Sequence, residues 1–243
     1  MSRTPLAADA APALLFLPVL PGPGSRIELA AADARYVARV CRARVGERVE
    51  ATDGRGARAL LRLVEVRHGV VVEMEAVSRE PARRCSWVLC GAPDGERADW
   101  LVEKLAELGV GRFLPVDAAR GSWKTAAGRR ARWERLAIAA LRQSRRLHLM
   151  AIEEPASLQL ALSSLPRGSN RWLADPSGAG AGRGLAPTGG EPAIGLVGPS
   201  GGLDDGERQA ALVAGFQPLR LSDARLRTET AALAWAVWWS AGG

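Results

Sequence analysis

The hydrophobic pattern of this chain changes its period near Glu80-Pro81, and that change limits the fold more than any other feature. Before it, short aliphatic and β-branched runs alternate with turn residues, at 14–19, 48–52, 58–66 and 70–76. Asp53-Gly54 followed by Gly56, between two such runs, predicts a hairpin. One helical stretch is expected over 30–44. Short strands at close and even spacing are typical of a small β-barrel.

Beyond residue 80 the pattern alternates between strands and helices. Strands are expected at 87–91, 112–116, 171–174, 193–197 and 217–221, and helices at 96–108, 126–147, 204–214 and 228–239. Gly109 is placed to end the first of these helices, and the Gly-, Ala- and Pro-rich residues 175–192 are expected to form a loop. Such alternation predicts an α/β domain with a mostly parallel sheet and helices on both faces. We therefore expect two domains, residues 1–78 and 79–243.

Composition narrows the class of protein. Hydrophobic residues make up 47% of the 243 residues, which excludes a disordered or fibrous chain. No apolar run reaches the roughly 20 residues that a membrane span needs, and the run at 14–20 contains Pro18, so neither a membrane span nor a signal peptide is expected. The 3 cysteines and 2 histidines lack the spacing of a disulfide framework or a metal site. We expect a cytoplasmic protein without a metal.

The net charge of +7 is concentrated in one segment. Residues 120–148 carry nine basic residues and one acid, Glu134, which gives a local charge of +8. This is the electrostatic footprint of a contact with a nucleic-acid backbone. A solvated helix face is the alternative, but the compensating acids found elsewhere in the chain are missing from this segment. We therefore favour contact with nucleic acid.

A glycine-rich turn, Gly198-Pro199-Ser200-Gly201-Gly202, follows the strand expected at 193–197. Glycines let backbone amides approach a ligand, and ligands favour the carboxyl ends of parallel strands. The turn lacks the residues of a P-loop and the spacing of a dinucleotide fingerprint, so a tight structural turn and a binding loop stay equally open. Asp204 with Glu207 is typical of a structural helix cap.

Polar residues also crowd the start of the last expected helix, at 225–231. Thr228 or Thr230 would satisfy free helical amides, and Glu229 would suit the positive end of the helix dipole. An ordinary cap and a functional site are therefore both open.

Three tryptophans, Trp235, Trp238 and Trp239, lie further along this helix. Such residues belong to a core or a subunit interface more often than to a base-stacking platform, and we favour the interface. His68 and His148 alone do not make a catalytic triad credible. For His148, an RNA contact or a solvated side chain is favoured over a catalytic base. Hydrolytic and metal-dependent chemistry are not expected.

Several motifs together resemble one known family. They are Tyr36-x-x-Arg39-Val40-Cys41-Arg42-x-x-x-Gly46, Glu103-Lys104-Leu105-Ala106-Glu107-Leu108-Gly109-Val110, Pro115, Arg120, Gln143-Ser144-Arg145-Arg146, Gly198-Pro199-x-Gly201-Gly202 and Leu226-Arg227-Thr228-Glu229-Thr230-Ala231. In this order they resemble the RsmE family of 16S ribosomal RNA methyltransferases. That family methylates the N3 atom of one uridine with S-adenosylmethionine (SAM).

The resemblance covers nearly the whole chain and implies a fold. A small PUA-like β-barrel, which binds RNA, would precede a SPOUT methyltransferase domain whose C-terminal part forms a deep trefoil knot. Knots break the general rule that chains do not thread loops. The resemblance also implies a homodimer that acts on 16S rRNA or the small ribosomal subunit.

The resemblance further implies which residues form each site. The cofactor would be held by Gly198, Pro199, Ser200, Gly201, Gly202, Leu221, Ser222, Leu226 and Thr228. RNA would be bound by Arg42, Arg120, Gln143, Arg145 and Arg146.

The catalytic problem is the uridine N3 atom, which carries a proton and is a poor nucleophile. The enzyme must favour loss of that proton and hold the lone pair in line with the sulfonium methyl group. We expect Arg227 to stabilise the developing uridinate charge. Glu229 would accept the proton or fix this arginine in place, and we favour the second role.

Three departures from the family pattern lie at the expected cofactor site. Ser200 stands where the family has Glu, Ser222 stands where it has Gly, and an arginine is lost at Ala224 while Arg225 appears next to it. These changes motivate an alternative function: an RNA-binding protein of SPOUT fold with weak or lost methyltransferase activity.

Two further departures lie on elements expected to face RNA. Arg142 precedes Gln143 where the family has Glu-Gln, and Tyr36 replaces a histidine of the barrel. They motivate a third hypothesis, a SPOUT methyltransferase with a shifted RNA target.

Overall fold

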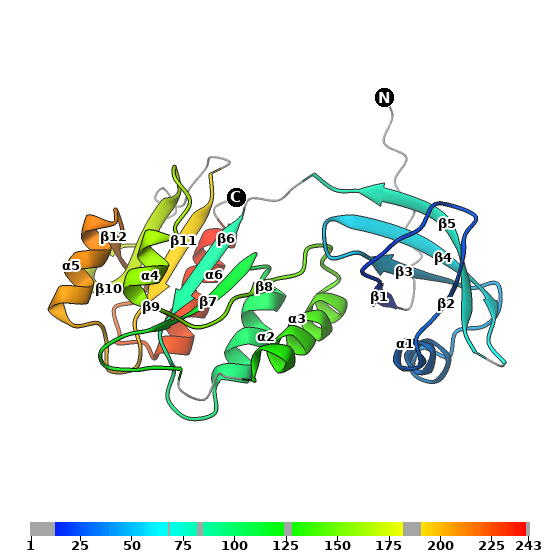
Figure 1. Ribbon diagram of the computed structural model, residues 1–243, viewed down its shortest axis with the longest axis horizontal. Coiled ribbons are helices and arrows are strands. Elements are labelled where there is room, and N and C mark those ends of the chain that lie inside the picture. The colour runs from blue at the N-terminus through cyan, green and yellow to red at the C-terminus, as the bar shows by residue number, and fades with distance from the viewer. Residues whose placement is uncertain (1–12, 68, 82–84, 124–127, 182–190, 242–243) are drawn as a thin grey trace. The chain divides into compact units, whose positions relative to one another are not determined.

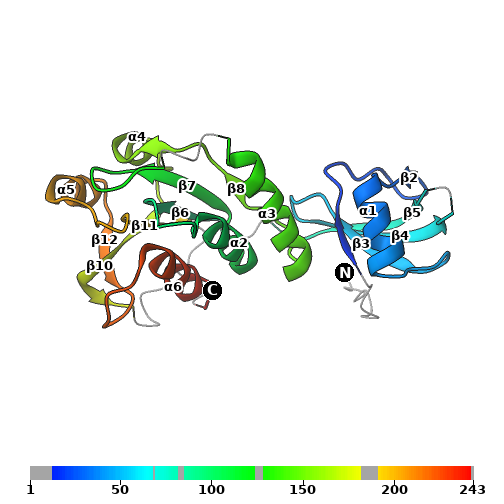
Figure 2. The same ribbon diagram turned by 90° about the horizontal axis from the view of Figure 1, so that it is seen from below.

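The computed structural model describes residues 13–67, 69–81, 85–123, 128–181 and 191–241. Contacts divide the chain into two compact units (Figures 1 and 2). The first contains Met1–Ala82 together with Arg142–His148, and the second contains Arg83–Leu141 with Leu149–Gly243. The segment at 142–148, expected to belong to the second domain, thus clusters with the first unit. His68 lies outside the described residues.

The first unit is built on a five-stranded sheet in the order β1-β3-β4-β5-β2. Its strands are β1 (Leu14–Phe16), β2 (Arg26–Glu28), β3 (Arg48–Thr52), β4 (Ala57–Glu65) and β5 (Val71–Arg79). The hairpin predicted at residues 53–56 joins β3 to β4 as an antiparallel pair. Along β4 the residues Ala59, Leu61 and Leu63 alternate into the core, as a half-buried strand requires. The three-residue strand β2 was not predicted.

The helix predicted at 30–44 is shorter than expected. It consists of α1 (Ala31–Arg35) and a π-helical turn, η1 (Tyr36–Val40). Arg42 has φ 52°, and a non-glycine residue with positive φ cannot continue a right-handed helix. Arg145, with φ 55°, follows the end of α3 (Arg130–Ser144) in the same way.

The second unit contains a parallel sheet in the order β12-β10-β11-β6-β7-β8, with β9 paired to β7. The strands are β6 (Ser86–Cys90), β7 (Arg112–Asp117), β8 (Ala151–Ile152), β9 (Ala156–Ser157), β10 (Asn170–Gly180), β11 (Ala193–Val197) and β12 (Gln217–Arg220). The remaining helices are α2 (Ala98–Leu108), α4 (Leu158–Ser163), α5 (Asp205–Val213) and α6 (Thr228–Ala241). The parallel α/β sheet predicted from the alternating pattern is confirmed.

Helices cover both faces of this sheet (Figure 2). Residues Val88 and Val197 pack with α2, α3 and α6 on one face. Their chain neighbours Leu89 and Leu196 pack with α4 and α5 on the other. All five residues of β11 are buried, as expected for a strand covered on both faces.

Strand β10 runs past its predicted end at residue 174 into the segment expected to be a loop. Its pairing with β12 shifts register between Ala174 and Ala179. At Gly178 an added Cβ would lie 2.4 Å from the carbonyl carbon of Pro218, so the two backbones approach where only glycine fits. Residues 182–190 of the expected loop lie outside the described part of the chain.

Trp235 is fully buried in the core of the second unit, so its predicted place in a subunit interface is wrong. It packs against β11 at Gly195, where an added Cβ would lie 2.4 Å from the indole ring. Trp238 and Trp239 are partly buried against the same core, and their role in an interface stays a prediction. Among the described residues, no helix has the length and apolar character to cross a membrane.

Candidate active site

A cavity of about 700 Å³ lies beyond the carboxyl ends of β11 and β12 and beside residues 173–176 of β10. These three strands are neighbours in the parallel sheet, and this edge of such a sheet is where ligands bind. The lining residues come mainly from three chain segments, 173–176, 197–203 and 219–229. Leu173, Val197 and Leu219 form part of its apolar wall.

Most residues expected to hold the cofactor, and both residues expected to be catalytic, line this cavity. They are Gly198, Pro199, Ser200, Gly202, Leu221, Ser222, Leu226, Arg227, Thr228 and Glu229. Gly201 does not line it. A Cβ at Gly201 would lie 2.9 Å from Cβ of Arg120, so this glycine lets the turn approach the loop that carries Arg120.

The turn at 198–202 is held in place from several sides. Gly202 N–H donates to the Pro199 carbonyl at 2.8 Å, and Gly202 has φ 74°. A Cβ on Gly91 would lie 2.2 Å from the Pro199 nitrogen, so the end of β6 touches the turn directly. Thr228 Oγ1 donates to the Gly198 carbonyl at 3.1 Å and thereby joins the start of α6 to the turn.

The segment at 221–227 is neither helix nor strand, so its backbone amides and carbonyls are not used in a regular hydrogen-bond ladder. Ser222 Oγ accepts a hydrogen bond from Ala224 N–H at 3.1 Å, which closes a local turn. The Ser222 side chain thus has a partner within its own segment while the residue lines the cavity.

Three carboxylates line the cavity, and sequence analysis singled out Glu229 among them. Glu229 is 2% exposed and forms an ion pair with Arg97. The arginine partner expected for it was Arg227. Burial raises the pKa of the Cys90 thiol, and the negative charge of Glu229 raises it further, so this thiol stays protonated.

Asp175 and Asp94 are the cavity carboxylates that sequence analysis missed. Burial alone would raise the pKa of Asp175, but hydrogen bonds from Ser177 and the guanidinium of Arg208 hold it below its ordinary value. The Arg208 Nε atom lies 2.7 Å from Asp175 Oδ2. Asp94 accepts a hydrogen bond of 2.6 Å from Ser200 Oγ. The position of Asp94 in the sequence could have identified it. It follows the predicted strand that became β6, and residues just beyond the carboxyl ends of parallel strands lie at the ligand-binding edge of the sheet.

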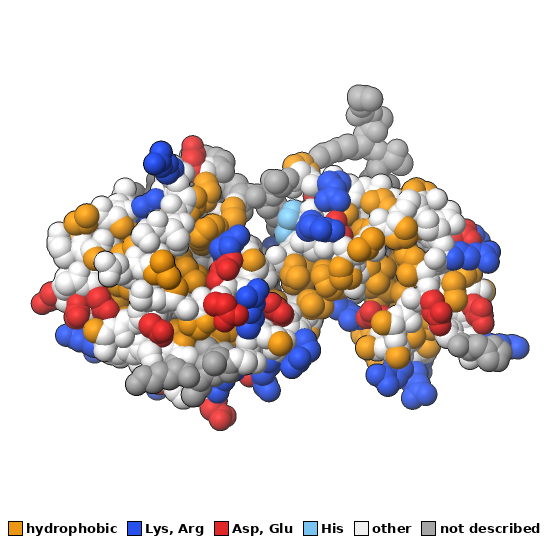
Figure 3. Space-filling view, viewed as in Figure 1, with side chains coloured by type: hydrophobic (Ala, Val, Ile, Leu, Met, Phe, Trp, Pro, Cys, Tyr) orange, Lys and Arg blue, Asp and Glu red, His pale blue; other side chains and the backbone are white. Residues whose placement is uncertain are grey.

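The basic segment at 120–148 has acidic partners that are distant in sequence. Arg132 pairs with Asp99 at 2.5 Å, and Arg130 pairs with Glu154 at 3.0 Å as well as with Glu134. Figure 3 likewise shows acidic and basic side chains close together on the face in view. The segment itself contains one acid, but in the folded chain acids from other segments neutralise part of its positive charge.

Within the first unit, arginines of the same segment pair with acids of the small sheet domain. Arg142 Nη1 lies 3.0 Å from Asp33 Oδ1, and its guanidinium stacks over the Tyr36 ring at 4.7 Å. Arg145 Nη2 lies 2.6 Å from Glu50 Oε2. Residues Arg142 and Tyr36, two departures from the family pattern, therefore contact each other.

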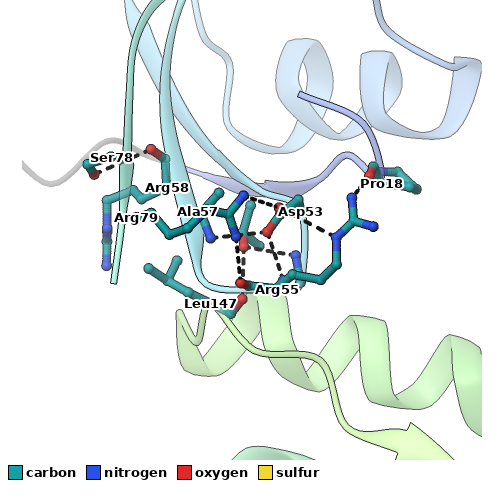
Figure 4. A network of polar contacts seen from close by, with 10 residues as sticks. Pro18, Asp53, Arg55, Ala57, Arg58, Ser78, Arg79 and Leu147 are labelled. Atoms are coloured by element: carbon teal, nitrogen blue, oxygen red, sulfur yellow. Dashed lines mark hydrogen bonds and ion pairs between the residues drawn. The ribbon is translucent and has the colours of Figure 1, made fainter. Parts of the chain in front are cut away.

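Hydrogen bonds to a backbone carbonyl fix the end of this segment to the β3–β4 hairpin (Figure 4). The Leu147 carbonyl accepts from Thr52 Oγ1 at 3.1 Å and from Gly56 N–H at 2.9 Å. Asp53 stabilises the hairpin by accepting from Arg55 N–H, Ala57 N–H and the Arg79 guanidinium. Burial opposes ionisation of Asp53, but these hydrogen bonds outweigh it and lower its pKa.

The residues predicted to bind RNA are divided between the two units. Arg42, Gln143, Arg145 and Arg146 belong to the first unit and Arg120 belongs to the second. Arg42, Arg120, Gln143 and Arg145 are exposed. Arg120 Nη1 lies 3.5 Å from the Gly201 carbonyl, so this arginine stands beside the glycine-rich turn.

The fold and the cavity agree with family models of RNA-modifying enzymes. A model described as an RNA methyltransferase domain matches residues 81–240, and a model described as an RNA methyltransferase PUA domain matches residues 29–75. The chain belongs to this RNA methyltransferase family. The fold predicted from the sequence, a PUA-like domain followed by a methyltransferase domain, is confirmed, while the trefoil knot stays a prediction.

Individual relatives point to one branch of the family. The chain is 28% identical to ribosomal RNA small subunit methyltransferase E of Synechocystis sp. over 217 residues, 84% of this chain and 69% of that protein. It is 28% identical to the protein of the same name from Mycobacterium bovis, over 90% of this chain and 87% of that one. The predicted resemblance to the RsmE family is confirmed.

Solved structures agree. The enzyme of this name from Neisseria gonorrhoeae, bound to S-adenosyl methionine, has a TM-score of 0.83 at 28% identity, covering 93% of this chain and 95% of that one. A Legionella pneumophila protein with bound SAM has a TM-score of 0.80 at 25% identity, covering 94% and 96%.

Proposed function

We propose that the chain transfers a methyl group from SAM to the N3 atom of a specific uridine in 16S ribosomal RNA. The observation that carries this proposal is the cavity at the carboxyl ends of β11 and β12 in a chain of the RNA methyltransferase family. The relative from Neisseria gonorrhoeae, solved with S-adenosyl methionine, supports the same cofactor here.

The cavity fits SAM in size and chemistry. Its volume of about 700 Å³ lies within the range of small-molecule sites. Its apolar residues suit an adenine ring, and the irregular backbone at 221–227 offers hydrogen-bonding groups to the ring edge. The cofactor would be held by Gly198, Pro199, Ser200, Gly202, Leu221, Ser222, Leu226 and Thr228, with Gly201 positioning the turn. When bound, SAM supplies an electrophilic methyl group.

The residues of the chain would bind and orient the target base. Arg227 is exposed at the cavity and would stabilise the negative charge that develops on the uridine oxygens. Glu229, buried against Arg97, would hold the start of α6 and so position Arg227. The residues expected to bind RNA are Arg42, Arg120, Gln143, Arg145 and Arg146, with the arginines contacting phosphates.

The wider proposal concerns assembly and location. Residues 1–78 would form the RNA-binding domain, and 79–243 the knotted methyltransferase domain. The partially buried Trp238 and Trp239 favour a homodimer built on α6. The substrate would be the 16S rRNA or the small ribosomal subunit, in the cytoplasm.

Two alternatives keep the fold and change the activity. Ser222 in the cavity wall favours a protein that binds RNA with weak or no methylation. A shifted RNA target was suggested by Arg142 and Tyr36.

One pair of experiments separates these functions. Calorimetry with SAM tests the cofactor, and incubation with methyl-deficient small subunits followed by mass mapping of the rRNA tests the target. We expect micromolar SAM binding, about −8 kcal/mol, and one new N3-methyluridine. If SAM binding is not detected, the SAM titration is repeated with RNA present. A protein that binds RNA but does not bind SAM in either titration would support the first alternative. Methylation at another nucleotide or atom would support the second.

A further inference from the structure

The three carboxylates of the cavity differ in their partners. Asp175 is paired with Arg208, and Glu229 is paired with Arg97. Asp94 instead accepts a hydrogen bond from the neutral hydroxyl of Ser200, at 2.6 Å from Oγ to Oδ1. Within the described parts of the chain, Asp94 forms no ion pair. A carboxylate that holds an arginine must weaken that ion pair to take a proton, whereas Asp94 need not.

The topology places Asp94 at the carboxyl-end edge of the sheet, in the wall of the cavity proposed to bind SAM. It follows β6, and Ser200 follows β11, which is paired with β6 in the parallel sheet. Ser200 N–H also donates to the Ala92 carbonyl at 3.4 Å, so the two loops are joined twice. Asp94 is exposed and lines the cavity, whereas Glu229 is 2% exposed. An incoming nucleotide can therefore reach Asp94.

We propose that Asp94 is the proton acceptor for the N3 atom of the target uridine. This inference rests on the proposed function. The N3 proton moves to Oδ2 of Asp94 while Oδ1 keeps the Ser200 hydrogen bond. The electron pair left on N3 forms the bond to the methyl carbon, the sulfur–methyl bond breaks, and its electron pair stays on sulfur as a neutral thioether.

The surrounding charges assist this transfer. The other charged residues that line the cavity are Asp175, Arg208, Arg225, Arg227 and Glu229. Asp175 is paired with Arg208 and Glu229 with Arg97, which leaves Arg225 and Arg227 to face the substrate. Their positive charges would stabilise the uridinate anion that forms when N3 loses its proton. Glu96 and Arg97, in the same loop as Asp94, do not line the cavity.

The test replaces Asp94 with Asn, which keeps the size of the side chain and an oxygen for the Ser200 hydroxyl but cannot accept the proton. Asp94→Asn should lower the single-turnover methylation rate by about 10² or more, the usual contribution of a general base. SAM affinity and rRNA affinity should be unchanged. Asp94→Glu should recover part of the rate. Glu96→Gln, which removes one charge from the same loop outside the cavity, is the matched control and should methylate at the wild-type rate.

A second readout separates proton transfer from a structural role. Small subunits reconstituted with 5-fluorouridine-containing 16S rRNA carry a more acidic N3, so the loss caused by Asp94→Asn should shrink on this substrate. The rate of the variant should also rise with pH as N3 ionises in solution, while the wild-type rate stays flatter.

Two kinds of result would overturn the inference while leaving the proposed function intact. One is an equal loss on both substrates at every pH. The other is an unchanged rate or a loss of SAM affinity in Asp94→Asn. A wild-type protein that binds SAM but methylates a different atom would overturn both this inference and the proposed N3 chemistry.

Discussion

Replacing Gly91 with Ala should disrupt the cofactor site, although Gly91 itself does not line the cavity. The new Cβ would lie 2.2 Å from the Pro199 nitrogen, and such carbons essentially never come closer than 3.0 Å to another heavy atom. The turn at 198–202 must therefore retreat from β6 by about 0.8 Å, the difference between these two distances. Neither side can yield by rotating a side chain, because the clash is with backbone.

This displacement has a cost in stability and in binding. Overpacking of this kind lowers the free energy of unfolding by about 1–3 kcal/mol. A site displaced by almost 1 Å should also lose at least about tenfold in SAM affinity, or 1.4 kcal/mol. Denaturant unfolding and calorimetric SAM titration measure the two effects separately.

Gly206→Ala is the matched control. Gly206 lies in the first turn of α5, and the nearest atom to an added Cβ is Asp204 Oδ1, at an ordinary 3.4 Å. This variant should bind SAM like the wild type. If Gly91→Ala also bound SAM with wild-type affinity at unchanged stability, the argument that the turn and β6 together shape the cofactor site would be refuted.

Three further perturbations test other parts of the molecule. Replacing Arg145 and Arg146 with Ala should weaken rRNA binding and flatten its dependence on salt without changing SAM affinity, and an unchanged salt slope would show that the segment does not contact phosphates. Trp238→Glu with Trp239→Glu should convert the expected dimer to a monomer in light scattering, and a persisting dimer would contradict the interface. Asp53→Asn should lower the free energy of unfolding by about 1–3 kcal/mol at neutral pH, because three donors lose an ionised acceptor. The pKa of Asp53 is lowered in the folded state, so ionised Asp53 stabilises the fold above the unfolded pKa, near 3.8, and this contribution fades as the pH falls below that value. The free energy of unfolding of the variant should therefore depend less on pH in acid.

The elements that sequence analysis predicted well are those with a complete local signal. Strand β11 has the predicted bounds because five buried residues stand between Pro192 and Gly198. Helix α2 ends before Gly109, which has φ 81°. The strands β2, β8 and β9 were missed because strands of two or three residues are too short to show an alternation of apolar and polar side chains.

The missed parts of the candidate site depend on contacts between distant segments. Asp94 and Ser200 are 106 residues apart in the sequence, and only the pairing of β6 with β11 brings them together. The partner of Glu229 could not be predicted either, because Arg97 comes from the loop before α2 and lies 132 residues away. A local pattern predicts helices and strands, but the partners of a charged side chain follow from the order of strands in the sheet.

The departures from the family pattern become coherent once these contacts are known. Arg142 stacks on Tyr36 and pairs with Asp33, so both unusual residues are accounted for by one contact within the first unit. The contact gives both residues a structural role, and the mapping of the methylated nucleotide tests whether they also change the RNA target.

At the cavity, Ser200 stands where the family has a glutamate, and its hydroxyl donates to the carboxylate of Asp94 in the loop after β6. The arginine absent at Ala224 is matched by Arg225, which lines the cavity. A carboxylate and an arginine therefore stand beside two of the three altered positions. The cavity thus presents both carboxylates and arginines, which suits the proposed methyltransferase activity.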